Sequence, residues 1–254
     1  MHITEQRRRE LLAHAGPPVI DARADTRHTM HFVIRILKSW PRKIAMHGLT
    51  QLPPMIHHLQ LENGIPLPLA NCSTLVKMWA EDVEAGCGKF AYTGIALEVR
   101  RLLDEHTTYS DSTLLSAMQS VRILLIVLVF NTECPLPSHQ TAPLLIDVWE
   151  MKHRLAKRGL FLEQELQHGV PPWQEWAFMS ARRTTIMALH HLEWAWSLAN
   201  GYPELLCFEL GPLPAPAAKH LWQADDESRW QQLYKAWLEN WKDGLFILAE
   251  LMPI

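Results

Sequence analysis

Residues 111–130 read DSTLLSAMQSVRILLIVLVF, and this stretch decides the fold. Asp111 or Ser112 suits the start of a helix, because short polar side chains can accept hydrogen bonds from the free N–H groups there. Every residue from Ile123 to Phe130 is apolar, so this part of the helix has no polar face. The apolar run is far shorter than the roughly 20 residues that span a bilayer. We therefore expect a central core helix and no membrane segment.

Apolar residues with a helical period flank this stretch on both sides. Before it they are Met30, Val33, Ile34, Leu37 and Trp40, then Leu75, Met78, Trp79 and Val83, then Tyr92, Ile95, Ala96, Val99, Leu102 and Leu103. After it, Leu144, Leu145, Val148, Trp149 and Leu155 fall within a helix expected over about 141–158. We expect Pro41 to end the first of these helices, because proline removes a backbone donor. Pro171-Pro172 and Asn200-Gly201 should open and close a further helix.

The most distinctive part of the C-terminal half is a tryptophan-rich helix. Asp225 or Asp226 is placed to cap it. Its apolar residues follow the i, i+3, i+4, i+7 pattern and are Trp230, Leu233, Tyr234, Trp237, Leu238 and Trp241. We expect a stability element here, so that Trp237→Ala costs about 3 kcal/mol or more. A short last helix is expected to hold Leu245, Ile247, Leu248 and Leu251.

The organisation that these signals predict is all-α. We find no alternating strand pattern, no Gly-rich turn between a strand and a helix, and no internal repeat. Residues 1–24 are expected to be a lightly structured lead-in, and residues 25–254 a single irregular multi-helix domain with a buried central helix. Its connections are rich in proline, above all residues 47–69.

Composition argues against nucleic-acid binding by these residues alone. The chain has 254 residues and a formal net charge of -3, whereas a free-standing DNA-binding domain is usually basic. Only three apolar residues follow Arg7–Arg9, which is too few for a secretory signal peptide, so we expect an intracellular protein. We interpret Arg7–Arg9 as the start of a frayed helix in preference to a nuclear-import patch.

The cysteines and histidines do not have metal-site spacing. No two of Cys72, Cys87, Cys134 and Cys207 lie within four residues of each other, so we expect four buried thiols. His190 and Glu193 could supply two zinc ligands, but neither His190 nor His191 has a ligand partner four residues away. We interpret them as the polar edge of a buried helix. The adjacent His57 and His58 are expected to make turn hydrogen bonds beside Pro53-Pro54.

Three further patterns invite a functional interpretation, and each has a simpler one. Asp225-Asp226-Glu227 resembles an acidic Mg²⁺-binding helix motif but suits a helix cap better. The pairs Arg100-Arg101 and Arg182-Arg183 could contact phosphates, but we expect them to be solvated. Nucleophile elbows and phosphate-binding glycine loops are absent. The sequence therefore assigns no catalytic, cofactor-binding or metal-binding residue, and enzyme activity is not expected.

Several short segments, in order along the chain, resemble the fungal-specific transcription-factor regulatory domain. They are Leu-Pro-Pro-Met-Ile-His at 52–57, Leu-Ala-Asn-Cys at 69–72 with the following helix at 75–79, Glu98 with Arg101-Leu102, Leu-Leu-Ser-Ala-Met-Gln at 114–119, and the block from 182 to 238. Met55 stands where that family usually has an aromatic residue. The family's six-cysteine zinc module has no counterpart in this sequence.

This resemblance implies a regulatory domain of a transcription factor, or of a similar regulator, located in the nucleus. Its partners would be coregulator proteins or a second copy, with DNA contacted only through a zinc module that is absent from this chain. No cofactor or membrane is implied. The alternative is a stand-alone helical protein that binds or converts a small apolar metabolite, with Trp173, Trp176, Trp194 and Trp196 lining the pocket.

Overall fold

The computed structural model describes residues 24–84, 89–130, 136, 138–202, 212–241 and 247. The helices are α2 (Ala24–His47), α3 (Leu67–Glu84), α4 (Lys89–Glu105), α5 (Asp111–Phe130), α6 (Ser138–Lys157), α7 (Glu163–Leu166), α8 (Trp173–Asn200), α9 (Lys219–Trp222) and α10 (Glu227–Asn240). Short 3-10 turns are η1 (Gly48–Thr50), η2 (His58–Leu61) and η3 (His106–Thr108). Within the described ranges no strand forms, which confirms the all-α prediction.

The central helix is α5, as the sequence predicts. Every residue from Leu114 to Val129 is buried. Its N-terminal cap differs from the prediction: Ser110, one residue earlier than expected, accepts a hydrogen bond at Oγ from the Thr113 N–H at 3.3 Å. By length and composition Asp111–Phe130 could cross a membrane, with a mean hydropathy of 2.0, but 89% of that window is buried inside the fold. Burial among the protein's own helices accounts for its apolar composition.

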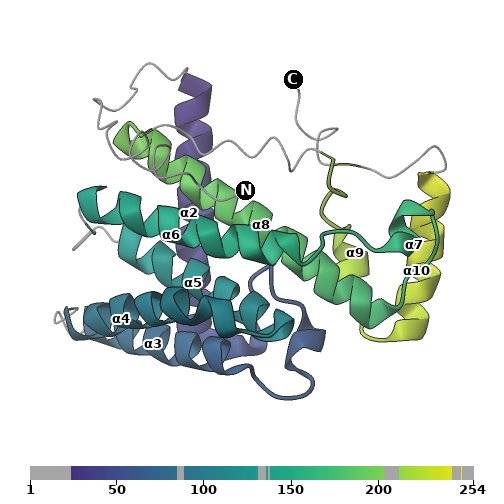
Figure 1. Cartoon of the computed structure of the whole chain (residues 1–254), viewed down its shortest axis with the longest axis horizontal. Coiled ribbons are helices and arrows are strands. Elements are labelled where there is room, and N and C mark those ends of the chain that lie inside the picture. Colours follow the sequence, from purple (N-terminus) through teal and green to yellow (C-terminus); the bar gives the residue numbers. More distant parts are fainter. Residues whose placement is uncertain are drawn as a thin grey trace.

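The other long helices cover α5. Contacts with α5 come from α2, α3, α4, α6 and α8. Figure 1 shows α3 and α4 on one side of α5, α6 and α8 on the other, and α2 crossing behind them. The sequence of α5 explains this arrangement, because its second half, residues 123–130, is apolar on every side and has to be covered by other helices.

Pro41 lies inside α2 and does not end it, so the expected helix end at this residue is wrong. A proline in a helix interior removes one hydrogen bond and typically costs about 3 kcal/mol. The helix continues because the next turns still bury apolar surface: Pro41 itself is buried, and Ile44 is 1% exposed in the main core. The end of α8 follows the prediction, with Gly201 in the left-handed conformation at φ 68°.

A second, smaller core lies at the N-terminal end of α8, where α7, α9 and α10 gather (Figure 1). Its buried residues are Trp173, Trp176, Ala177, Leu221, Ala224, Trp230, Tyr234 and Leu238. Asp226 caps α10 as predicted, accepting from the Arg229 N–H at 2.8 Å. Leu233 and Trp237 are only partly buried, so Trp230 and Tyr234 supply most of the buried aromatic surface of α10.

The last predicted helix is wrong at the one position that the structure describes. Ile247 forms an antiparallel bridge with Pro214 instead of a helical turn. The other expected members, Leu245, Leu248 and Leu251, lie outside the described residues. So does the expected lead-in over 1–24, apart from its last residue, Ala24, where α2 begins.

Arg182 and Arg183 are buried, which corrects the expectation that this pair is solvated. Arg183 donates to both carboxylate oxygens of Glu165 at 2.8 Å. Arg182 donates to the carbonyl oxygens of Arg158 and Gly159, each at 2.7 Å. The sequence offers no partner within one helical turn of either arginine, because the partners lie about twenty residues away. These hydrogen bonds from Arg182 and Arg183 hold the connection between α6 and α7 against α8.

We predict that Trp230→Ala lowers the free energy of unfolding by about 3–5 kcal/mol, because a fully buried tryptophan leaves a large cavity. Trp230 is 0% exposed and packs against Trp176, with ring centroids 5.1 Å apart. Trp237→Ala should cost less, because its ring is only partly buried. Urea unfolding of both variants, beside the exposed control Gln232→Ala, measures the difference. A loss at Trp237 equal to that at Trp230 would contradict this ranking.

We predict that Glu165→Gln lowers the free energy of unfolding by about 3–5 kcal/mol, because it leaves the buried Arg183 guanidinium without its counter-charge. The side chains of Arg183 and Glu165 are 5% and 3% exposed. Glu81→Gln, in the exposed Lys77–Glu81 pair, is the control and should change stability by less than about 1 kcal/mol. Thermal and denaturant melts compare the two, and similar losses in both would show that burial does not matter here.

Candidate functional site

A groove of about 550 Å³ runs along the surface between α3 and α4. Its lining residues are Asn71, Thr74, Leu75, Gly94, Leu97, Glu98 and Arg101. These positions recur every three or four residues on each helix, so each helix turns one stripe toward the groove. The two helices are consecutive in the chain and pack directly against each other (Figure 1).

The middle of the groove is apolar because Leu75, Gly94 and Leu97 line it. A Cβ at Gly94 would lie 3.3 Å from Leu75 Cδ2, which is a tight contact. Leu97, one turn further along α4, is 66% exposed. Met78 on α3 and Phe90 on α4 add further exposed apolar surface on these two helices. Exposed apolar side chains that gather on one face indicate a contact surface for another molecule.

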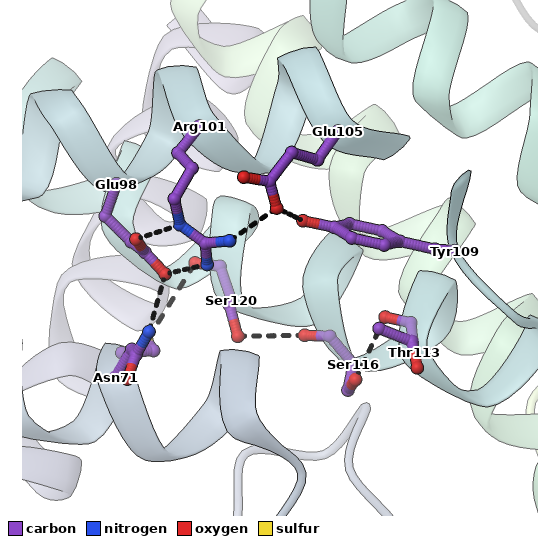
Figure 2. A network of polar contacts seen from close by, with 9 residues as sticks. Asn71, Glu98, Arg101, Glu105, Tyr109, Thr113, Ser116 and Ser120 are labelled. Carbon is purple, nitrogen blue, oxygen red and sulfur yellow. Dashed lines mark hydrogen bonds and ion pairs between the residues drawn. The ribbon is translucent and has the colours of Figure 1, made fainter. Parts of the chain in front are cut away.

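One end of the groove carries a hydrogen-bonded network, shown in Figure 2. Glu98 accepts hydrogen bonds from Asn71 Nδ2 at 3.1 Å and from Arg101 Nε and Nη2 at 2.8 and 2.7 Å. Arg101 Nη1 also donates to Glu105 at 2.6 Å, and the Tyr109 hydroxyl donates to the same carboxylate at 2.9 Å. The network thus joins the start of α3 to the second half of α4.

The network has one guanidinium between two carboxylates, so its net charge is negative. Burial opposes ionisation of Glu98, but the hydrogen bonds from Arg101 and Asn71 outweigh it and lower the pKa of Glu98. The bond to Glu98 is the main cause that raises the pKa of Arg101. Burial, with the bond to Glu105, raises the pKa of Tyr109 to about 12. The lowered pKa of Glu98 and the raised pKa of Arg101 keep both groups charged at neutral pH. The net negative charge of the network is available to a cation.

The nucleophilic side chains near the network are covered or already hydrogen-bonded. Cys72, behind the network, is fully covered, and burial raises the pKa of its thiol well above the usual value. Its Sγ lies 3.9 Å from the Ser120 carbonyl oxygen of α5. The hydroxyls of Ser116 and Ser120 are likewise taken, donating to the carbonyl oxygens of Thr113 and Ser116 at 3.0 and 2.8 Å (Figure 2).

Sequence patterns do not predict this groove, although Glu98 and Arg101 belong to the segments quoted above. The missed signal is that Phe90 and Leu97 are apolar yet fall outside the core-facing stripe of α4. Arg100, expected to be solvated, has a side chain that is 53% exposed and pairs with Asp147 of α6 at 3.0 Å. Arg101 is held by the network instead of projecting freely into solvent.

The predicted polar edge at His190, His191 and Glu193 contains a buried ion pair. Glu193 accepts from Lys152 Nζ at 2.5 Å, with both side chains buried, so its carboxylate already has a cationic partner. Burial raises the pKa of Glu193. In the described part of the chain no three His, Cys, Asp or Glu residues gather as a metal site would require. Cys87, Cys134 and Cys207 lie outside that part.

His57 and His58 form the predicted turn. The Ile56 N–H donates to the Pro53 carbonyl at 2.9 Å, and His57 Nδ1 accepts from the Leu59 N–H at 3.3 Å. The two imidazole rings stack with centroids 4.4 Å apart. His57 is also fully buried against Trp222, at 4.6 Å between ring centroids, which the sequence did not indicate.

Three of the four tryptophans proposed to line a pocket lie in two different cores. Trp173 and Trp176 belong to the second core, whereas Trp196 lies in the main core and packs against Tyr202 at 4.7 Å between centroids. Trp194 is partly buried. Asp226, in the acidic run, is the helix cap already described, with Asp225 and Glu227 exposed beside it.

We predict that His57 makes stability fall with acidity. Burial first, and the neighbouring His58 second, lower the pKa of His57 from 6.5 to about 3. Between these values the unfolded chain binds a proton that the folded chain does not, so this contribution is complete above pH 6.5 and is lost as the pH falls toward 3. The slope reaches about 1.4 kcal/mol per pH unit.

Denaturant unfolding of wild type and His57→Asn between neutral and acid pH isolates this term, because titrating carboxylates cancel in the difference. Asparagine keeps an acceptor for the Leu59 N–H. His31→Asn, at an exposed histidine of α2, is the control and should leave the slope unchanged. Parallel pH profiles for wild type and His57→Asn would refute the prediction.

Comparison of the chain with protein-family models, with curated proteins and with solved structures finds no match. The resemblance to the fungal regulatory domain therefore rests on the collinear segments alone, and the groove is the feature from which function can be argued.

Proposed function

We propose that this chain is a helical regulatory domain that acts by protein–protein contact, and that its α3–α4 groove binds an amphipathic helix of a partner protein. The observation that carries this proposal is the groove itself, with an exposed apolar centre and a fixed network of negative net charge at one end. The apolar side chains of Leu97 and Phe90 contribute little to folding, since they leave most of their surface in water.

A partner helix fits the groove better than an extended peptide. An extended peptide binds chiefly by pairing with the free edge of a sheet, and the described residues form no sheet. A helix instead presents apolar residues at i, i+3 or i+4, and i+7, which can pack on Leu75, Gly94 and Leu97. A Lys or Arg on that helix would meet Glu98 and Glu105, whose charges Arg101 neutralises only in part.

The setting we propose for this contact is transcription regulation in the nucleus, with a coregulator as the partner. Its support is the order of the segments that resemble the fungal regulatory domain. Three of them contribute to the groove or its network: residues 69–72 through Asn71, the following helix through Leu75, and the Glu98–Arg101 pair. The proposal assigns no DNA contact to this chain.

A display library of helical peptides tests the groove. We expect the purified protein to select peptides with an apolar i, i+3 or i+4, i+7 stripe and a basic residue beside it. Leu97→Asp should weaken their binding at least tenfold, a loss of about 1.4 kcal/mol, because it places a charge at the apolar centre. Leu166→Asp is the matched control, since Leu166 is 61% exposed on α7.

Two outcomes decide the proposal. Equal binding of the peptides by Leu97→Asp and Leu166→Asp would show that they bind elsewhere on the protein. It would refute the α3–α4 groove as the binding site. The regulatory setting is tested separately by fusing the chain to a heterologous DNA-binding domain in a reporter strain. Reporter output that changes with the fusion and is restored to baseline by Leu97→Asp supports it, and an unchanged output contradicts it.

A further inference from the structure

Arg122 is a guanidinium buried in the core, and the described residues provide it with no counter-charge. It is 1% exposed and lies on α5, the helix that the whole fold covers. Its Nη1 donates to Met55 Sδ at 2.8 Å, and thioether sulfur is a weak acceptor. Its Nε is buried and has no hydrogen-bond partner in the part of the chain that the structure describes. An ionised group taken out of water in this way is strongly unfavourable unless something pairs with it.

The other two buried arginines show that this fold can supply counter-charges. Arg183 has Glu165, and Arg182 has Asp111 at 3.5 Å. Among the described residues no carboxylate forms an ion pair with Arg122, and burial alone lowers its pKa. Because arginine keeps its proton in proteins, the positive charge stays in the core. A paired partner must therefore come from elsewhere, or the charge remains uncompensated.

On the side of α2, a partly buried side chain covers Arg122. The Trp40 ring lies over the guanidinium, 4.2 Å from Cζ to the ring centroid, and Trp40 is only partly buried. The next residue is Pro41, which leaves the carbonyl of Leu37 without its helical donor and weakens α2 at this turn. On α8, His191 is exposed at the surface and close enough to Arg122 to interact with its charge.

We propose that Arg122 is the recognition group of a closed binding site for a small apolar monocarboxylic acid, with Trp40 as its cover. One guanidinium matches one carboxylate, since its N–H groups can bind both oxygens at once. The two side chains in contact with the guanidinium, Met55 and Trp40, are apolar and aromatic, so the body of the ligand is aliphatic or aromatic. A dianion such as phosphate would need a second cation beside Arg122. This site is separate from the α3–α4 groove and does not depend on it.

Ligand-dependent melting of the full chain tests the proposal. Octanoate and phenylacetate are the probes, octanol and 2-phenylethanol are the neutral counterparts, and inorganic phosphate is the dianion. We expect the acids to raise the melting temperature of the wild type progressively with concentration, and the alcohols and phosphate to leave it unchanged. Arg122→Met should abolish the response to the acids, whereas Arg100→Met, at an exposed arginine, should keep it.

A second measurement keeps the test decisive if Arg122→Met does not fold. Trp40 covers the guanidinium, so the acids should change tryptophan fluorescence in the wild type and not in Trp40→Phe. A wild-type melting temperature that neither acid raises, or an equal rise in wild type and Arg122→Met, would overturn the proposal. A rise with phosphate as large as that with the acids would overturn the assignment to monocarboxylic acids.

Discussion

The constraint on which the structure depends is that the second half of α5, from Ile123 to Phe130, has no polar face to turn toward water. Every residue from Leu114 to Val129 is buried, and five other helices contact α5 to cover it. The helix α2 continues through Pro41 because ending it there would uncover this core. The free energy gained by burying apolar surface is roughly proportional to the buried area. A long helix covered on all sides therefore provides a large share of the stabilisation. The α3–α4 groove lies on the outside of this shell, where side chains are free to serve recognition.

Within that apolar core, two polar side chains of α5 hold one irregular segment in place. Gln119 donates to the Met55 carbonyl at 2.7 Å and exchanges hydrogen bonds with Gln60. Arg122, one turn later, reaches the sulfur of the same Met55. The Gln119 amide has hydrogen-bond partners for both its nitrogen and its oxygen, whereas the Arg122 guanidinium lacks an adequate partner among the described residues. We therefore interpret Gln119 as a structural residue and connect Arg122 with a ligand.

The sequence could predict what depends on local pattern and could not predict what depends on distant partners. The buried α5, the start and end of α8, and the Asp226 cap all follow from periodicity and from residue preferences within a turn. Arg183 was misjudged because Glu165 is eighteen residues away. Pro41 was misjudged because tertiary burial outweighed a local penalty. The groove was missed because it requires knowing that α3 and α4 pack side by side.

Residues 55–57 belong to both cores at once. Met55 and Ile56 lie in the main core, while the His57 ring packs on Trp222, which borders the second core formed with α10. Three consecutive residues cannot leave one core without disturbing the other. The two cores should therefore open as one cooperative unit, and the amide protons of α10 should exchange with solvent only when those of α5 become able to do so. The small second core is thereby protected against hydrogen exchange to the same degree as the main core.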